Sequence, residues 1–383
     1  MSVRQAIHDL ETSRIADIVA LGFGDPEVVA LWYGEGDVPT PSFIGEAAAA
    51  AMRAGETFYT YKAGLPELRQ AIADYLTGLY TRPVAMERIV VTSAGIGALM
   101  LVAQALIDPG ENLVIVAPIW PNIAAVVSIM GGEPRLVSLD PQPGGGWRLD
   151  LDKLIAACDA RTKGIFVNSP ANPTGWMASA EEIAALTAFA RRRGLWIVAD
   201  EVYNRIVYGN QVAPSFLVPG EPDDRLIVVN SFSKTWAMTG WRLGWVVIPP
   251  DLLPTMEKLI EFNTSGSPTF LQRAGIAAIR DGEPFVQSFV ARCRDAREAA
   301  IDALRSCRRV EVARPDGAFY AFLRVAGVTD SASFAKELLV RTKVGLAPGS
   351  AFGPMGEGYL RLCCAREPAA IAAAVERLRP MLD

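Results

Sequence analysis

Seven short apolar runs that alternate with stretches of helical periodicity constrain the fold of this chain more than any other feature. The runs are rich in Val and Ile, and most are apolar on both faces, as strands covered by helices on two sides must be. Alternation of strands and helices predicts an α/β fold with a mostly parallel sheet and helices on both of its faces. The seven expected strands are Ile89–Thr92, Leu113–Val116, Arg135–Leu139, Gly164–Asn168, Trp196–Asp200, Leu226–Asn230 and Leu243–Ile248.

The last two runs are separated by too little chain for an ordinary crossover helix, so we expect one of them to run antiparallel to its neighbours. Beyond Asp251 the pattern changes to long helical stretches around one more strand-like run, Gly317–Phe322. We therefore expect a large domain over residues 42–282 and a smaller α+β domain over residues 283–383, with residues 1–41 packing against the smaller one. The helices expected in this half are Asp251–Asn263, Phe270–Arg280, Pro284–Arg305, Ser331–Arg341 and Glu367–Leu382.

Composition and charge exclude several classes of function. The 383 residues carry a formal net charge of −5, without the concentrated basic patch that nucleic-acid binding requires. His8 is the only histidine, which rules out a His-cluster metal site and argues against a Ser-His-Asp triad. The five cysteines are scattered and odd in number, which favours buried thiols in a reducing compartment over disulfides or zinc ligands. With no signal-peptide pattern and no membrane-length apolar run, we expect a cytoplasmic protein without a metal, nucleic-acid or membrane partner.

The segment Ser231-Phe-Ser-Lys234 comes directly after an apolar run, and Arg242 follows eight residues later. A buried lysine is costly unless it is paired or used. At the mouth of a sheet, desolvation lowers the pKa of such an amine and lets it form an imine with an aldehyde. The hydroxyls of Ser231 and Ser233 and the guanidinium of Arg242 suit a phosphate. An aldehyde that carries a phosphate is pyridoxal 5'-phosphate (PLP), although a solvated surface loop is the simpler interpretation of this one motif.

Other expected strand ends carry side chains that suit the same ligand, because ligands of a parallel sheet bind beyond its carboxyl ends. Ile89–Thr92 is followed by Ser93-Ala-Gly-Ile-Gly97, where free N–H groups and a helix dipole would hold a phosphate. Trp120 follows the second strand and could stack on a flat ring. Asn172, held extended by the proline after it, could donate to a ring oxygen.

The fifth strand ends in the carboxylate of Asp200, with Tyr203 shortly after it. Each of these residues alone has a plainer interpretation: Asp200 as a helix cap, Trp120 as core, Asn172 as part of a turn. Together, and in strand order, they supply a phosphate cradle, a stacking face, a ring-oxygen donor, a carboxylate and an imine-forming amine. Those are the parts that a PLP site requires.

Several motifs along nearly the whole chain resemble those of the class I/II aminotransferases, the aspartate aminotransferase superfamily of fold-type-I PLP enzymes. They fall in the family's order. These motifs are Gly34-Glu-Gly-Asp-Val-Pro-Thr-Pro41, Tyr59-Thr-Tyr-Lys-Ala-Gly-Leu-Pro-Glu-Leu-Arg69, Asn172-Pro-Thr-Gly175, Asp200-Glu-Val-Tyr203, Ser231-Phe-Ser-Lys234 with Arg242, and Gly358-Tyr-Leu-Arg361.

The resemblance implies a role for each matching residue. Lys234 would carry the internal aldimine and shuttle the proton, and Asp200 would keep the pyridine nitrogen protonated. Arg361 would grip the substrate carboxylate. The remaining expected contacts are Tyr203 and Asn172 with the ring oxygen, Trp120 with the ring face, Ala94, Gly95, Ser231, Ser233 and Arg242 with the phosphate, Ile96 with the cofactor, Gly34 and Asn172 with the substrate, and Tyr59 with the phosphate of a partner subunit in a homodimer.

One departure from the family pattern bears on the substrate. The resemblance implies that aspartate-specific members of the most similar bacterial subgroup place a lysine where this chain has Ile96. An isoleucine cannot pair a charge, and a buried carboxylate beside it would be costly. Trp32 and Tyr33, just before Gly34, are candidates for the pocket lining, with core packing as the equal alternative. We therefore expect a neutral amino donor with an apolar or aromatic side chain.

The resulting hypothesis is a ping-pong aminotransferase that moves an amino group from an amino acid to a 2-oxo acid through a pyridoxamine phosphate form. A PLP-dependent carbon–sulfur β-lyase is the main alternative, because the same lysine, aspartate and tyrosine serve both reactions. A non-enzymatic PLP-binding regulator is a remote alternative, since only a short segment precedes Gly34. A nicotinamide dehydrogenase also fits an α/β sheet, but no Gly-x-Gly-x-x-Gly follows the first strand.

Overall fold

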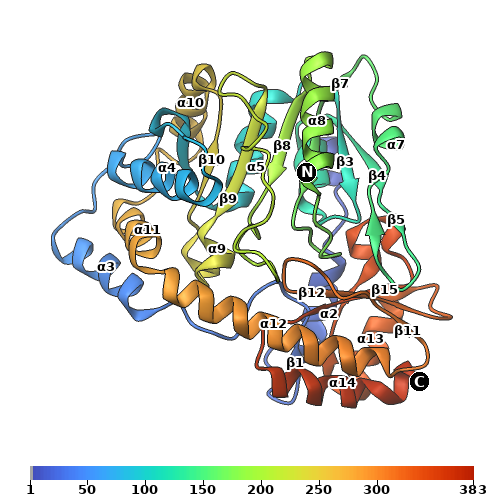
Figure 1. Ribbon diagram of the computed structural model, residues 1–383. Helices are drawn as coiled ribbons and strands as arrows, with labels where there is room; N and C mark the ends of the chain where they lie inside the picture. The colour runs from blue at the N-terminus through green and yellow to red at the C-terminus, as the bar shows by residue number, and fades with distance from the viewer. Residues whose placement is uncertain (1–2) are drawn as a thin grey trace.

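The computed structural model describes residues 3–383 and contains a large and a small β-sheet (Figure 1). All seven expected strands are present in the large sheet, whose order is β2-β10-β9-β8-β7-β3-β4. Strand β10 is antiparallel to both of its neighbours and the other pairs are parallel, as the short connection before it predicts. The strands are β2 (Ile89–Thr92), β3 (Asn112–Ala117), β4 (Glu133–Ser138), β7 (Thr162–Asn168), β8 (Trp196–Asp200), β9 (Leu226–Ser231) and β10 (Gly244–Val247).

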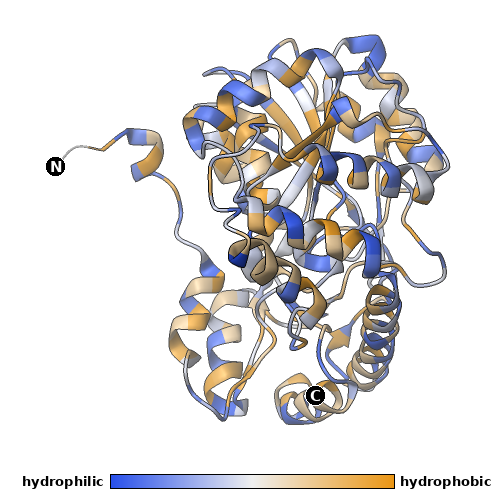
Figure 2. Cartoon of the chain, turned by 90° about the vertical axis from the view of Figure 1, so that its left-hand side faces the viewer, coloured by the Kyte–Doolittle hydropathy of each residue, from blue (hydrophilic) through white to orange (hydrophobic). Residues whose placement is uncertain are grey.

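Helices cover both faces of this sheet, so its strands are buried on two sides. Figure 2 shows the strands as a mostly apolar layer between helices of mixed polarity. The apolar core on one face includes residues of α5 (Ala94–Leu106), α6 (Asn122–Ile129) and α10 (Leu253–Asn263). The core on the other face includes residues of α3 (Ser42–Arg53), α4 (Pro66–Tyr80), α7 (Leu151–Ala156), α8 (Ala180–Arg193) and α11 (Thr269–Asp281).

The small sheet is antiparallel and has the order β11-β12-β15-β14. Its strands are β11 (Val310–Glu311), β12 (Tyr320–Val325), β14 (Ala347–Pro348) and β15 (Tyr359–Cys363), and the helices beside it are α12 (Glu283–Arg305), α13 (Ser331–Thr342) and α14 (Pro368–Leu382). Strand β12 begins three residues later than the sequence predicts. Ala318 has a φ of +57°, outside the extended region, so the chain turns before it enters the sheet.

The N-terminal segment packs with the C-terminal part of the chain. It contains α1 (Gln5–His8), α2 (Arg14–Gly22) and β1 (Val29–Ala30), and β1 pairs in parallel with β13 (Val344–Gly345). Residues of α2 share one apolar core with α12, α13, α14 and the small sheet. The domain boundaries proposed from the sequence stay a prediction. Within residues 3–383 no helix is both long and apolar enough to cross a membrane.

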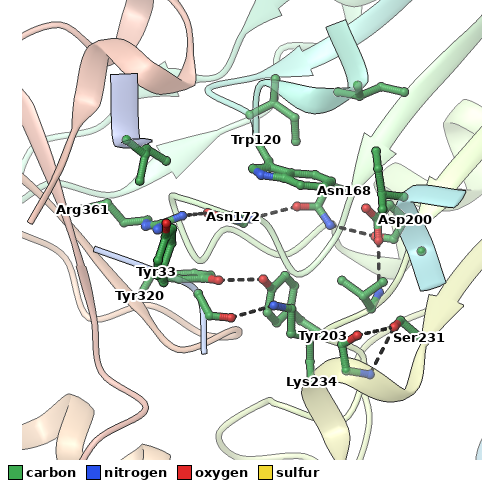
Figure 3. Close-up of a pocket in the computed structure, with 18 of the residues that line it drawn as sticks. Tyr33, Trp120, Asn168, Asn172, Asp200, Tyr203, Ser231, Lys234, Tyr320 and Arg361 are labelled. Carbon is green, nitrogen blue, oxygen red and sulfur yellow. Dashed lines mark hydrogen bonds between the residues drawn. The ribbon is translucent and has the colours of Figure 1, made fainter. Parts of the chain in front are cut away.

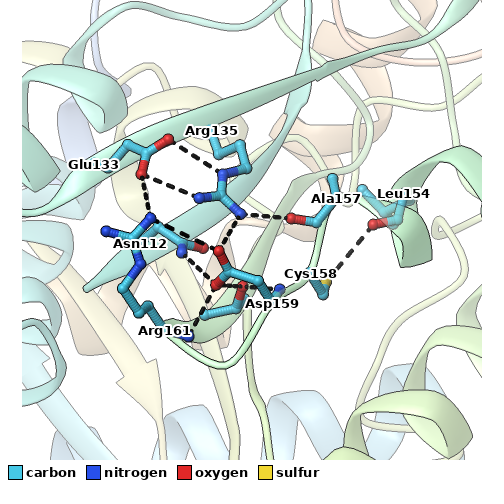
Figure 4. A network of polar contacts seen from close by, with 9 residues as sticks. Asn112, Glu133, Arg135, Leu154, Ala157, Cys158, Asp159 and Arg161 are labelled. Atoms are coloured by element: carbon cyan, nitrogen blue, oxygen red, sulfur yellow. Dashed lines mark hydrogen bonds and ion pairs between the residues drawn. The ribbon is translucent and has the colours of Figure 1, made fainter. Parts of the chain in front are cut away.

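A polar network ties together the amino ends of β3, β4 and β7, the edge of the sheet opposite to the strand ends discussed above (Figure 4). The Asp159 carboxylate accepts a hydrogen bond of 2.9 Å from the Asn112 amide and pairs at 3.1 Å with Arg135. Arg135 also pairs with Glu133 at 3.1 Å. These contacts, that of Asn112 first, hold the pKa of Asp159 well below its usual range. The charged groups of this network are paired with one another, and none of them lines the cavity described below.

Candidate active site

A cavity of about 320 Å³ opens beyond the carboxyl ends of the parallel strands, where the sequence places the chemistry (Figure 3). Strands of the large sheet supply one side, and β12 and β15 of the small sheet supply the other. The cavity is lined by these expected site residues: Gly34, Gly95, Ile96, Trp120, Asn172, Asp200, Tyr203, Ser231, Ser233, Lys234, Arg242 and Arg361.

Lys234 lies on α9 (Phe232–Thr235), the single helical turn that follows β9. Its Nζ donates a hydrogen bond of 2.6 Å to the carbonyl oxygen of Gly34. Burial, reinforced by the nearby positive charge of Arg361, lowers the pKa of Lys234 to about 8. At pH 8 about half of these amines are therefore neutral, against less than about 1% for an ordinary lysine. Lys234 is a nucleophilic amine under mild conditions.

Asp200 is the last residue of β8, and its carboxylate is buried against the cavity. Its Oδ1 accepts a hydrogen bond of 3.2 Å from the Val202 backbone N–H. Burial raises the pKa of Asp200 to about 6, while this bond and the charge of Lys234 act in the opposite direction. The carboxylate is thus ionised near neutral pH, and a cationic ligand group beside it would hold its charge more firmly.

Asn168, at the end of β7, was not identified from the sequence. Its amide donates at 2.9 Å to the Asp200 carbonyl, and its Oδ1 accepts at 2.8 Å from the Asn172 backbone N–H. It therefore ties the ends of two neighbouring strands together and sets the position of Asn172. A polar side chain at the carboxyl end of an apolar strand was the sequence feature that could have identified Asn168 as a site residue.

Tyr203 is buried, and burial raises the pKa of its phenol well above the usual value. Its hydroxyl lies 2.7 Å from the hydroxyl of Tyr320, the first residue of β12. Tyr320 is fully buried from bulk solvent but lines the cavity. The sequence analysis treated it only as part of a strand, because nothing local distinguishes it from a core aromatic residue.

Small residues, hydroxyls and an arginine form a cradle at one end of the cavity. The cradle lies at the N-terminus of α5, a helix of 13 residues that begins at Ala94. Ser231 Oγ donates to Ser233 Oγ at 2.8 Å and accepts from the Ser233 backbone N–H at 3.1 Å. Arg242 is exposed on the cavity side, with φ of +55° and its Nη1 donating to the Thr239 carbonyl at 2.6 Å. Ala94 itself is buried, so only its backbone could contribute.

Arg361 lies on β15 and is 2% exposed. Its Nη1 donates to Asn172 Oδ1 at 2.8 Å, its Nη2 donates to the Trp32 carbonyl, and its guanidinium lies 4.6 Å from the Tyr320 ring centroid. Within residues 3–383 no carboxylate forms an ion pair with it, and its buried Nε has no partner. A buried guanidinium without a counter-ion is costly, so an anionic ligand group is the natural partner.

The wall near Trp120 is apolar and comes from distant parts of the chain. Ile96 contributes from α5, and the other aliphatic or phenylalanine side chains that line the cavity, none identified as such from the sequence, are Ile15, Ile119, Ile123, Phe166 and Val202. Tyr33 lines the cavity as expected, but Trp32 does not: it is buried in the small-sheet core, against Gly22 and Gly345. The chain bends at residues 32–34, so these two neighbouring side chains point in different directions.

Tyr59 lies outside this cavity. It is 90% exposed and lines a separate open groove with Phe58 and Tyr61. Nothing in the single chain brings it near the cradle, so its expected phosphate contact depends on a second subunit.

The donor set around the cavity fits PLP. A helix N-terminus, two serine hydroxyls and Arg242 suit the phosphate. The buried Asp200 carboxylate suits a pyridinium nitrogen, and the free amide group of Asn172 and the phenol of Tyr203 suit the ring oxygen. Lys234, with its lowered pKa, suits the aldehyde. No cluster of His, Cys, Asp or Glu in the described part of the chain could hold a metal ion instead.

Comparison with known proteins points the same way. The family model described as Aminotransferase class I and II matches residues 26–378. The chain is 31% identical over 385 residues to an aspartate aminotransferase of Pyrococcus horikoshii, covering 99% of this chain and 95% of that protein. A solved aromatic aminotransferase from Pyrococcus horikoshii superposes with a TM-score of 0.88 at 32% identity, covering 96% and 98% of the two chains. Thermus thermophilus aspartate aminotransferase with maleate gives 0.91 at 29% identity, covering all of both chains.

Proposed function

This chain belongs to the class I and II aminotransferase family and is a PLP-dependent transaminase of fold type I, and we propose that its amino donor is a neutral amino acid with an apolar or aromatic side chain. The observation that carries the proposal is the composition of the cavity. A cation for the donor's α-carboxylate, Arg361, is present, while the wall that includes Ile96 offers no cation for a second carboxylate.

The proposed roles of the residues follow from their positions. PLP, when bound, supplies an aldehyde that links covalently to amines and a ring that accepts electrons from the substrate. Lys234 holds the cofactor between turnovers and, once displaced by substrate, moves the proton at the substrate Cα. Asp200 keeps the ring nitrogen protonated, and Tyr203 and Asn172 donate to the ring oxygen. Arg361 binds the α-carboxylate and thereby orients the Cα–H bond toward Lys234.

A ping-pong order of substrates is part of the proposal. Donor and acceptor each carry a carboxylate next to the reacting carbon. Arg361 is the buried guanidinium that lines the cavity, and no carboxylate within residues 3–383 forms an ion pair with it. One such cation serves one carboxylate at a time. The oxo acid formed from the donor must therefore leave before the acceptor binds.

The apolar wall supports the neutral donor. Ile15 and Ile123 are less than 10% exposed, so a side chain placed among them is desolvated. An unpaired carboxylate in such a place loses much of its hydration free energy without compensation, whereas an apolar side chain gains from burial. Because several relatives are named aspartate aminotransferases, aspartate is the competing donor. The two proposals make different predictions for Ile96, which favours a neutral donor side chain over a carboxylate.

A donor series with a matched variant tests this proposal. Mixed with leucine, phenylalanine or aspartate without an acceptor, the enzyme should release about one oxo acid per bound cofactor and then stop. With an acceptor present, kcat/KM for aspartate should be at least tenfold lower than for leucine or phenylalanine, a difference of about 1.4 kcal/mol. Ile96→Lys should raise kcat/KM for aspartate and lower it for leucine, while Ile96→Met, of similar volume and no charge, should not favour aspartate. Aspartate as the best donor of the unaltered enzyme would contradict the proposal, as would continuous ammonia release from a cysteine conjugate.

We also propose that the active unit is a homodimer in which Tyr59 reaches the phosphate cradle of the other subunit. Exposed aromatic side chains line the same groove as Tyr59: Phe58 is 83% exposed and Tyr61 65%. Exposed apolar groups gathered in this way mark surfaces that another molecule covers. A two-fold symmetric dimer would bury this patch on both copies at once and bring each Tyr59 to the neighbouring site.

Hybrid dimers test the shared site. Lys234→Ala and Tyr59→Phe each impair every site of their own homodimer, but a hybrid contains one site with both native residues. Co-expression of the two variants under different tags should therefore recover activity in purified hybrids, to about half of the wild-type sites, against about a quarter in the unsorted mixture if subunits pair at random. Hybrids no more active than the parent variants, or fully active monomers in sedimentation, would refute the shared site.

A further inference from the structure

Tyr320 occupies the point at which the cofactor side and the carboxylate side of the cavity meet (Figure 3). Its hydroxyl contacts Tyr203, its ring lies under Arg361, and it packs against Gly34. We propose that Tyr320 is a positioning residue for the transamination site: its hydroxyl orients the phenol of Tyr203 toward the cofactor's ring oxygen, and its ring holds Arg361 for the substrate carboxylate. This inference rests on the roles proposed above for Tyr203 and Arg361.

The hydrogen bond between the phenols of Tyr203 and Tyr320 has a direction that its surroundings determine. Each hydroxyl has one proton, and they lie 2.7 Å apart, so one of them donates to the other. Among the described residues neither phenol has another hydrogen-bond partner. If Tyr203 is to donate to a ligand oxygen, Tyr320 must be the donor within the pair. A phenol that accepts a hydrogen bond is also a stronger donor, because the two bonds polarise each other.

The aromatic ring of Tyr320 packs against the guanidinium of Arg361. In the small sheet Tyr320 pairs with Cys363 and Phe322 pairs with Arg361, so Tyr320 and Arg361 are diagonal neighbours on one face. The guanidinium lies 4.6 Å from the Tyr320 ring centroid and 4.8 Å from that of Phe352. Two aromatic faces thus enclose a buried cation and restrict its rotamers without neutralising it. The guanidinium stays available to an anion and is held in one orientation.

The hydroxyl of Tyr320 also packs closely against Gly34. A Cβ atom on Gly34 would lie 2.1 Å from the Tyr320 hydroxyl oxygen, so only glycine allows the phenol to sit there. The carbonyl of the same residue accepts the hydrogen bond from Lys234. Tyr320 therefore packs against the segment that positions the amine as well as against Tyr203 and Arg361. A side chain that served only to fill the core would need the ring but not the hydroxyl.

Two substitutions separate the hydroxyl from the ring. Tyr320→Phe removes the hydrogen bond to Tyr203 and keeps the aromatic face under Arg361, whereas Tyr320→Leu removes both. Tyr208→Phe is the control, because it deletes a partly buried phenol that donates to the Ala318 carbonyl at 2.7 Å and does not line the cavity. Tyr203→Phe is the reference for full loss of the donor. Thermal unfolding of each variant identifies any that fail to fold.

Two measurements other than turnover report separately on the hydroxyl of Tyr320, which orients Tyr203, and on its ring, which holds Arg361. The first is the pH at which the absorbance of the Lys234-bound cofactor changes, since a donor to the ring oxygen stabilises the deprotonated form and lowers this pKa. The charged and titratable groups near it, Glu35, Asp200, Arg242, Arg361 and the Cys363 thiol, are unchanged in the tyrosine variants. The second is the affinity for 4-methylpentanoate, a leucine analogue without the amino group, which tests the carboxylate site.

Tyr320→Phe should raise the spectroscopic pKa by a few tenths of a unit, less than Tyr203→Phe, and leave carboxylate affinity within about twofold. Tyr320→Leu should raise the same pKa and weaken carboxylate binding roughly five- to thirtyfold, the span from an exposed to a desolvated cation–π contact. A spectroscopic pKa unchanged in Tyr320→Phe but shifted in Tyr203→Phe overturns the inference and leaves the proposed function standing. A pKa unchanged in both overturns the proposed role of Tyr203, and this inference with it. If Tyr320→Leu does not fold, Tyr320→Phe against Tyr208→Phe still decides the role of the hydroxyl.

Discussion

Lys234→Ala is expected to lower transamination turnover by roughly 10⁴-fold or more, because one side chain performs two tasks. The amine anchors the cofactor and, after substrate displaces it, carries the proton at the substrate Cα. Its hydrogen bond to the Gly34 carbonyl and the lowering of its pKa to about 8 by burial suit it to both. Steady-state kinetics with the best donor measure the loss, and equilibrium dialysis shows whether PLP still binds through the cradle.

Two controls separate chemistry from packing. Lys258→Ala removes an exposed lysine on α10 and should leave turnover unchanged. Adding a small primary amine to Lys234→Ala should restore part of the activity, because the truncated side chain leaves room for a diffusible base. Turnover within tenfold of the native enzyme, with PLP bound, would show that another group moves the proton.

Asp200→Asn is expected to leave the fold intact and to slow turnover by about 10²–10³-fold or more, the loss typical of removing one preorganised electrostatic group. The amide is isosteric but carries no charge, so it cannot keep the ring nitrogen protonated. The chain offers a matched control in Glu201→Gln. Glu201 is also buried, but its oxygens accept from Ser215 Oγ at 2.7 Å and the Phe216 N–H at 2.9 Å, and it does not line the cavity.

Glu201→Gln should therefore change stability more than turnover, and the two variants together separate a buried charge from a charge beside the cofactor. Comparable turnover of Asp200→Asn and the native enzyme at pH 8, well above the Asp200 pKa of about 6, would show that the carboxylate is structural. Thermal unfolding alongside the kinetics excludes misfolding as the cause of any loss.

The sheet could be predicted from the sequence because each strand is a local pattern. Runs such as Ile89–Thr92 and Trp196–Asp200 coincide with β2 and β8, and the short link before β10 predicts its antiparallel direction. The residues at the strand ends could be predicted too, since topology places all carboxyl ends at one edge. Lys234, Asp200 and Asn172 meet there for that reason.

The rest of the cavity depends on packing between segments far apart in the chain. Ile15 comes from α2 and Tyr320 from β12, and no local pattern distinguishes either from an ordinary core residue. The different positions of Trp32 in the core and Tyr33 in the cavity have the same origin, because the side that an irregular segment presents is set by what packs against it. The late start of β12 reflects the left-handed conformation of Ala318, which an alanine does not signal.

The measurement that tests the central claim most directly is reductive trapping of the cofactor on the purified protein. Borohydride reduces the bond between PLP and its lysine, and peptide mass spectrometry then locates the modified residue. The account predicts a single site at Lys234, absent from Lys234→Ala. Modification of another lysine, or of none in a protein that absorbs in the visible region, would contradict the assignment of this cavity as the active site.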